Sequence, residues 1–225
     1  MSTVPDLLHR DASAEPRLPA RHEPANGADV RSEAGLIAAL FLAATGYATL
    51  RYNVFKGVPW VDWPAYTLNK ALAVASLLMI VARVFRWRQA NRPTSLLMAT
   101  AGALALTHSL LSFALLNPGY YARLFDAGKL TFTAGLSLTL GAAVMAVMEL
   151  GARRSSQWTF PLRHGALALV ALAAGVHAAL PAIATWFDPS TWPGGMPPLT
   201  LISFASGLFG IAAWGLRTPK TSTKN

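Results

Sequence analysis

The sequence predicts an all-α membrane protein, a bundle of six transmembrane helices with both termini in the cytoplasm. Only 13% of its 225 residues are charged, against roughly 25% in an ordinary soluble domain. The mean hydropathy is +0.39, and the charges are gathered into short blocks that leave long apolar stretches between them. Because a helix of about 18 or more apolar residues can cross a bilayer, these stretches predict membrane-spanning helices.

Six apolar segments meet this length. They are Ala34–Tyr52, Ala65–Val84, Thr94–Leu116, Leu130–Met148, Gly165–Phe187 and Leu199–Leu216. At 1.5 Å per residue each is roughly 25 to 35 Å long, which matches a hydrocarbon core about 30 Å thick. Strands of a membrane barrel would be short and alternating, so helices are the expected spanning element.

The two ends of the chain differ in composition from this region. Residues 1–33 are rich in Pro, Ala, Arg, Glu and Asp, and they show no apolar period. We therefore expect a disordered cytoplasmic tail there, followed by one six-helix domain over residues 34–217 and a short cytoplasmic tail over residues 218–225. A cleavable signal peptide is not expected, because the first apolar run begins only at Ala34.

Basic residues predict the orientation. They are frequent after the second and fourth segments and in the C-terminal tail, and fewer after the first, third and fifth. Those assigned to the cytoplasmic side are Arg83, Arg86, Arg88, Arg92, Arg153, Arg154, Arg163, Arg217, Lys220 and Lys224. The positive-inside rule then gives both termini inside. Tryptophans near the segment ends fit interfacial anchors: Trp60, Trp63, Trp87, Trp158, Trp186 and Trp192.

Composition also excludes several kinds of site. The chain has no cysteine, which rules out disulfides, thiolate metal sites, iron–sulfur clusters and covalent attachment of a c-type haem. A metal or haem must therefore be held through His, Met, Tyr or carboxylates. The net charge of +9 does not predict nucleic-acid binding, because the basic residues sit in short blocks between apolar segments.

Two histidines lie deep in apolar segments, where an ionisable side chain needs a partner or a purpose. His108 is 14 residues after Thr94 and His177 is 14 residues after Arg163, so both are about 20 Å from the cytoplasmic ends of their helices. Two imidazoles at one level suit the axial positions of a b-type haem. The alternative is that each is a neutral histidine bonded to a nearby Ser or Thr.

A third histidine, His164, stands at the cytoplasmic start of the fifth segment, about 20 Å from His177 along one helix. It is a candidate ligand for a second haem. The third segment offers only Thr94 and Ser95 at the matching level, and neither is a good axial ligand. The alternative is an interfacial histidine near Arg163.

Lys70 is the single charge inside the second segment, about 7 Å below the outer surface in the predicted topology. It either snorkels to the lipid headgroups or pairs with a haem propionate, helped by Asn69. Arg123 and Lys129, in the loop after the third segment, are weaker candidates for the propionate.

The histidine pattern resembles a known family. Trp158, then Leu162-Arg163-His164, then His177, together with His108, are similar to the ferric reductase-like transmembrane domain over roughly Ala65 to Leu216. Within that family the chain is most similar to the haem-binding membrane subunit of bacterial periplasmic methionine sulfoxide reductase systems. The resemblance implies b-type haem associated with His108, His164 and His177, in a multi-pass protein of a bacterial inner membrane.

The expected function is electron transfer across the membrane by one haem b, or by two if His164 is also a ligand. No glycine-rich nucleotide motif is present, so we expect an oxidoreductase component whose donor is a separate flavin reductase or quinol. The resemblance implies a periplasmic reductase or ferric iron as acceptor. Two alternatives stay open: a small transporter or channel using Lys70, His108 and His177, and a structural membrane protein without haem.

Overall fold

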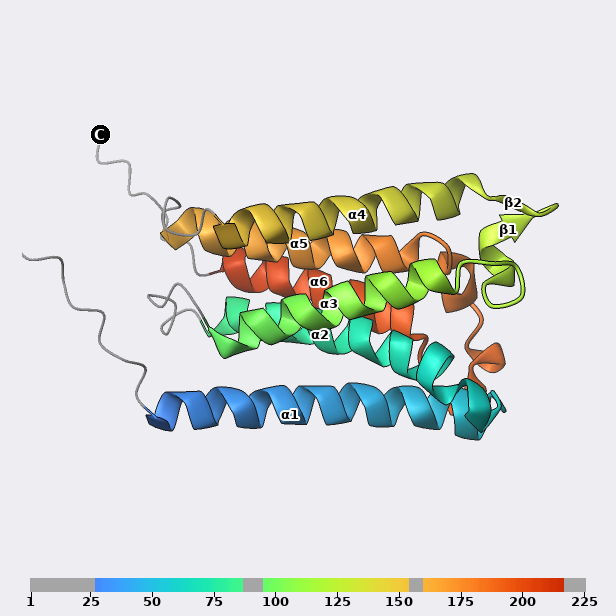
Figure 1. Cartoon of the computed structure of the whole chain (residues 1–225), viewed down its shortest axis with the longest axis horizontal. Helices are drawn as coiled ribbons and strands as arrows, with labels where there is room; N and C mark the ends of the chain where they lie inside the picture. The colour runs from blue at the N-terminus through green and yellow to red at the C-terminus, as the bar shows by residue number, and fades with distance from the viewer. Residues whose placement is uncertain (1–26, 87–94, 154–159, 217–225) are drawn as a thin grey trace, which may run out of the picture.

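The computed structural model describes residues 27–86, 95–153 and 160–216 of the chain (Figure 1). Within these residues six helices are long and apolar enough to cross a membrane, so the predicted six-helix bundle is confirmed. The α-helices are α1 (Gly27–Thr49), α2 (Leu68–Phe85), α3 (Leu96–Ala114), α4 (Phe132–Arg153), α5 (Phe160–Ala179) and α6 (Leu199–Gly215). Two π-helical stretches, η1 (Leu50–Phe55) after α1 and η3 (Trp63–Thr67) before α2, lengthen the first two spans.

Helix α2 is the central element of the bundle. Two thirds of its membrane-length window is buried inside the protein, against 11% for the windows of α1, α3 and α4. Its buried side chains, among them Leu77, Met79 and Ile80, form much of the apolar core. It contacts α1, α3, α5 and α6, whereas α4 packs mainly on α5 at the edge of the bundle (Figure 1).

Helices α5 and α6 approach each other closely because small residues face one another. A Cβ on Gly207 would lie 2.7 Å from the carbonyl oxygen of Ala171, and one on Gly175 would lie 2.9 Å from that of Ser203. Neither distance leaves room for a side chain. Small residues at such positions let two backbones touch, as is common between membrane helices.

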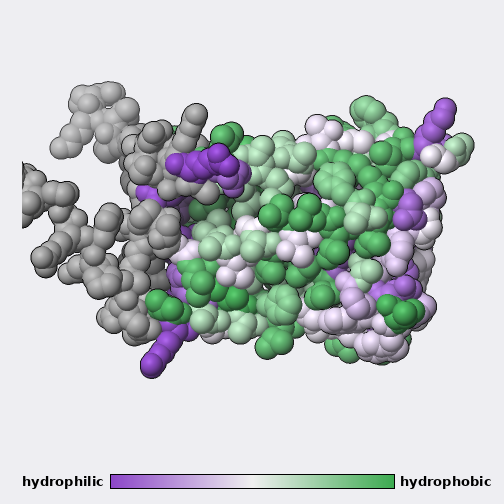
Figure 2. All heavy atoms as spheres, in the orientation of Figure 1, coloured by the Kyte–Doolittle hydropathy of each residue, from purple (hydrophilic) through white to green (hydrophobic). Residues whose placement is uncertain are grey.

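The outer surface of the bundle is apolar over its middle. Large hydrophobic side chains such as Leu106, Leu110 and Phe113 on α3 and Leu136 on α4 are exposed. Figure 2 shows hydrophobic residues across the centre of one face and hydrophilic residues toward its ends. Exposed apolar surface on this scale suits contact with lipid rather than water.

Helix α1 begins and α6 ends at the same end of the bundle (Figure 1). The opposite end, called the distal end below, is built from η1, η2 (Trp60–Asp62), η3, the α3–α4 connection and the α5–α6 connection. Most of the predicted tails, residues 1–26 and 217–225, lie outside the described residues. So do the basic residues and anchors Trp87, Arg88, Arg92, Arg154 and Trp158.

Several predicted boundaries differ from the structure, three of them at places where the local structure differs from the one expected. The fifth helix ends at Ala179 rather than Phe187, because Pro181 follows and disfavours helical backbone at the residue before it. The α5–α6 connection continues as the short 3₁₀ turns η6 (Ile183–Trp186), η7 (Pro189–Thr191) and η8 (Pro193–Gly195). At the N-terminus, α1 begins at Gly27, inside the stretch predicted to be a tail.

The third difference is a small hairpin before α4, where the fourth helix was expected to start at Leu130. Strands β1 (Phe125–Asp126) and β2 (Lys129–Leu130) pair antiparallel, after a 3₁₀ turn, η5 (Ala122–Leu124). The two turn residues, Ala127 and Gly128, have φ of 45° and 77°, the sign that a tight two-residue hairpin turn requires. Helix α4 starts only at Phe132, behind Thr131, whose Oγ1 accepts from the Ala134 amide at 3.2 Å.

Candidate functional site

His108 on α3 is held by an asparagine on α2. Its Nδ1 lies 2.9 Å from Oδ1 of Asn69 and 3.0 Å from the Asn69 backbone carbonyl oxygen. Because both oxygens can only accept, Nδ1 carries the ring proton and donates it to Asn69. The lone pair of this neutral imidazole is then on Nε2, which is the atom that can bind a metal.

Asn69 is itself fixed by two further bonds. It is fully buried, and its Nδ2 donates to Oγ of Ser112 at 3.0 Å and to the hydroxyl oxygen of Tyr121 at 3.1 Å. Tyr121 lies beyond the end of α3, where burial raises the pKa of its phenol, so it remains a neutral acceptor for Asn69. The orientation of His108 is thus set through a chain of side chains from α2 and the α3–α4 loop.

His177 on α5 is held in the same manner by α4. Its Nδ1 lies 2.7 Å from the backbone carbonyl oxygen of Ser137, and Oγ of Ser137 donates to the His177 carbonyl oxygen at 2.8 Å. Nδ1 of His177 therefore also carries the ring proton. Within the described residues, Nε2 of neither His108 nor His177 has a hydrogen-bond partner.

Gly141 leaves room for the His177 ring against the backbone of α4. A Cβ at this position would lie 3.0 Å from Cε1 and 3.1 Å from Nδ1 of the imidazole, closer than the roughly 3.5 to 4.0 Å of an ordinary nonbonded contact. A side chain at this point on α4 would press on the ring, whereas glycine lets the ring keep its position. No local feature of the sequence indicates this role, because Gly141 and His177 meet only in the folded chain.

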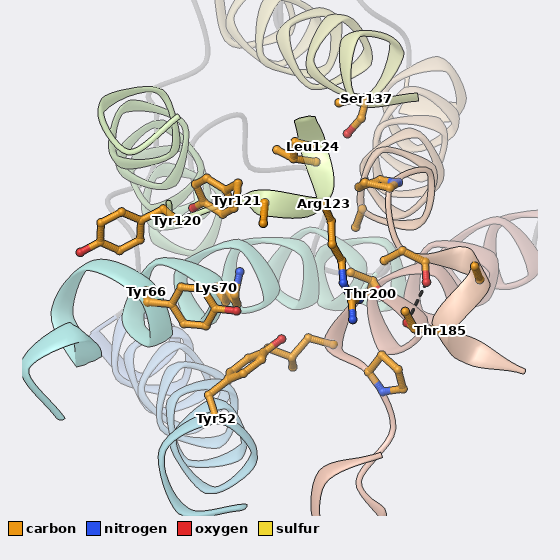
Figure 3. Close-up of a pocket in the computed structure, with 18 of the residues that line it drawn as sticks. Tyr52, Tyr66, Lys70, Tyr120, Tyr121, Arg123, Leu124, Ser137, Thr185 and Thr200 are labelled. Atoms are coloured by element: carbon orange, nitrogen blue, oxygen red, sulfur yellow. Dashed lines mark hydrogen bonds between the residues drawn. The ribbon is translucent and has the colours of Figure 1, made fainter. Parts of the chain in front are cut away.

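A cavity of about 720 Å³ opens at the distal end between α3, α4, α5 and the loops (Figure 3). Pockets of roughly 300 to 1,000 Å³ are typical of small-molecule and cofactor sites. His177 and its partner Ser137 line the cavity. His108 does not line it, but Ser112, one helical turn further along α3, does.

Lys70 lies among three tyrosine rings in the same cavity. Its Nζ is 4.2 Å from the ring centroid of Tyr66, 5.2 Å from that of Tyr121 and 5.7 Å from that of Tyr52, and Figure 3 shows Lys70 beside Tyr66 and Tyr121. Cations within about 6 Å of an aromatic ring are attracted to its face. Lys70 therefore has aromatic neighbours, while the Asn69 side chain, expected to help it, instead bonds His108.

The two other predicted basic residues are in different surroundings. Arg123, from η5, lines the cavity, and Figure 3 shows its side chain reaching into it toward Thr200. Lys129 is exposed on β2 and is not a lining residue. Of these two, only Arg123 is close to the candidate site.

His164 is far from this cavity. It is 1% exposed, and it does not line the cavity. The thirteen positions from His164 to His177 advance the helix about 20 Å and turn it by about 140° less than four full turns. The two histidines of α5 therefore point to different parts of the bundle. On α3, Ser95 is used as the helix cap, its Oγ accepting from the Met98 amide at 3.2 Å.

The described residues contain no group of three or more His, Asp or Glu side chains that could hold a metal ion by themselves. The candidate metal donors at the distal half of the bundle are thus the two imidazoles, each with Nδ1 bonded to a neighbouring helix. Two such donors from different helices fit a haem, whose macrocycle supplies the other four ligands of the iron. No family model matches this chain, and no curated protein matches it.

Proposed function

We propose that this chain is a haem b protein of a bacterial inner membrane that carries electrons to an acceptor outside the cell membrane. The proposal takes the six apolar helices as transmembrane, both termini as cytoplasmic and the distal end as the outer end. The apolar belt and the basic residues near the ends of α2, α4 and α6 support this orientation.

The observation that carries the proposal is the matched setting of the two deep histidines. Each donates its Nδ1 proton to a backbone carbonyl oxygen of an adjacent helix, which is the usual outer-shell arrangement of a metal-binding histidine. A histidine that only joins two helices gains most by using both ring nitrogens, because an unpaired polar atom inside a membrane is costly. His108 and His177 instead use one nitrogen each.

The protein residues have separate tasks in this proposal. His108 and His177 would bind the iron through Nε2, and Asn69 and Ser137 would fix the ring planes. Lys70 would lie near a propionate, because it follows Asn69 in the chain and lines the cavity. The apolar bundle would hold the haem within the membrane, and the bound haem would supply the one-electron chemistry.

The donor would be a separate flavin reductase or a quinol, and the acceptor a periplasmic reductase or ferric iron. This assignment follows the resemblance to the ferric reductase-like family. His164 would be a candidate ligand only for a second haem near the cytoplasmic side, because it does not line the distal cavity.

The test is the reduced minus oxidised absorbance spectrum of the purified full chain with the variants His108→Ala, His177→Ala and His164→Ala. A b-type spectrum is expected in the wild type, with the signal lost in the first two variants. His164→Ala acts as the matched control for one haem, and a partial loss there would indicate a second. Well-folded wild-type protein that contains no haem would exclude this function and leave the transporter and structural alternatives.

A further inference from the structure

The distal cavity contains a concentration of positive charge that the two histidines do not explain. Four of its lining residues are cations, Arg51, Lys56, Lys70 and Arg123, and Asp188 is the one carboxylate among the lining residues. We call the four cations the distal basic cluster. Among the described residues no ion pair is formed by any of the four.

Three of these cations meet around a single aromatic ring. Cζ of Arg51 is 5.9 Å, Nζ of Lys56 is 5.7 Å and Nζ of Lys70 is 5.7 Å from the ring centroid of Tyr52. Lys56 and Lys70 also share the ring of Tyr66, at 5.8 and 4.2 Å. The tyrosine rings partly offset the charge, but like charges this close to one another favour binding of an anion.

Arg51 is the most enclosed of the four cations. Its side chain is only 7% exposed, and one terminal nitrogen donates to the backbone carbonyl oxygen of Met196. Its Nε, however, is buried without a partner in the described part of the chain. That nitrogen is enclosed by the protein itself, so what Arg51 offers the cavity that it lines is its positive charge.

Arg123 completes the arrangement from the opposite wall. Figure 3 shows it extending from η5 toward Thr200. The cavity therefore offers guanidinium groups from two sides, ammonium groups beside Tyr52, and tyrosine hydroxyls. Guanidinium and ammonium donors in a partly enclosed site are the groups that bind carboxylate and phosphate.

We propose that the distal basic cluster is a binding site for an oxyanionic ligand, either a soluble carboxylate or phosphate compound or the phosphate of a lipid headgroup. This site is additional to the two histidines. Arg51, Lys56 and Arg123 are its main donors, while Lys70 is the residue that the proposed function places beside a haem propionate. The binding of an oxyanion does not depend on the proposed function. A role of that ligand as the electron acceptor rests on the proposed function.

The experiment measures binding of citrate and of inorganic phosphate to the purified full chain, as isolated, in phosphatidylcholine nanodiscs by titration calorimetry. Chloride at equal ionic strength is the reference. Lys56→Gln and Arg123→Gln change exposed side chains and should leave the fold intact. Each is expected to weaken binding of the better of the two anions roughly tenfold, the effect of losing one charge-assisted bond.

Lys129→Gln is the matched control, because Lys129 is an exposed cation of the same end that does not line the cavity. It should change the affinity less than twofold. Nanodiscs that contain phosphatidylglycerol distinguish a lipid headgroup from a soluble ligand. If phosphatidylglycerol lowers the affinity for citrate, the site binds a lipid headgroup. If the citrate affinity is unchanged, the site binds a soluble ligand.

Two results would overturn the inference. One is the absence of binding of either anion beyond that of chloride. The other is an equal loss in Lys129→Gln and Lys56→Gln, which would mean that only general electrostatics acts. The haem spectrum of the same samples is recorded separately, so failure of this site is distinguishable from failure of the proposed haem site.

Discussion

Replacing Gly141 by alanine should disturb the His177 ring without touching any polar group. The new methyl carbon would lie 3.0 Å from Cε1 and 3.1 Å from Nδ1 of His177. An ordinary contact needs roughly 3.5 Å or more, so the imidazole must move by a few tenths of an ångström. That shift acts on the short bond from Nδ1 to the Ser137 carbonyl oxygen, which is 2.7 Å long.

The expected size of the effect follows from the role of the displaced ring. Loss of correct support for a metal-binding histidine typically lowers metal affinity about 10- to 100-fold. We expect Gly141→Ala to lower the haem affinity about tenfold, the lower end of this range, because the ring can rotate as well as shift. Alanine also favours the helix by about 1 kcal/mol over glycine, so the loss is not expected to come from unfolding.

The assay is haem titration of the purified apo-protein, followed by the b-type absorbance. Gly135→Ala is the matched control: it lies on the same helix, it gains the same helix propensity, and a Cβ there would meet nothing within 4 Å. Equal haem affinity in Gly141→Ala and Gly135→Ala would refute the argument that the His177 ring lies against α4 when haem is bound.

Three further predictions concern the supports of the site and the bundle. Asn69→Ala removes one acceptor from Nδ1 of His108, and it should lower haem affinity about tenfold, measured by the same titration. Ser137→Ala keeps the acceptor nearest to Nδ1 of His177, the backbone carbonyl oxygen at 2.7 Å, whereas Asn69→Ala removes the nearer of the two acceptors of His108, at 2.9 Å. The effect of Ser137→Ala in that titration should therefore be smaller than that of Asn69→Ala; a larger one would contradict the assigned bond. Gly207→Leu should separate α5 from α6 and lower the thermal midpoint in detergent by an amount equivalent to about 1 to 3 kcal/mol. Gly46→Ala, which meets nothing within 4 Å, should leave that midpoint unchanged or higher.

The existence and number of the apolar helices could be read from the sequence, because long apolar runs with few charges have one common structural outcome in a membrane. Their ends were less predictable. Pro181 stops α5 well before the apolar run ends at Phe187, and the hairpin at Ala127 and Gly128 occupies part of what reads as a helix start. Hydropathy alone does not separate a helix from short turns that are equally apolar.

The candidate site was likewise only partly predictable from the sequence. His108, His177 and Lys70 stood out because polar side chains are rare in apolar segments. The bonds from the two histidines to Asn69 and Ser137 could not be predicted, since these residues lie 39 and 40 residues away from the histidines they bond. Such contacts depend on which faces of two helices meet, which apolar periodicity does not specify. Arg51 is a comparable case, because its importance comes from burial that the sequence does not display.

The most direct test of the account is the low-temperature electron paramagnetic resonance spectrum of the oxidised, haem-loaded wild-type protein. Binding of the iron by both His108 and His177 predicts a low-spin ferric signal with two histidine ligands, lost on substitution of either residue. A high-spin signal from an iron with one open axial position, or a low-spin signal that survives both His108→Ala and His177→Ala, would contradict it.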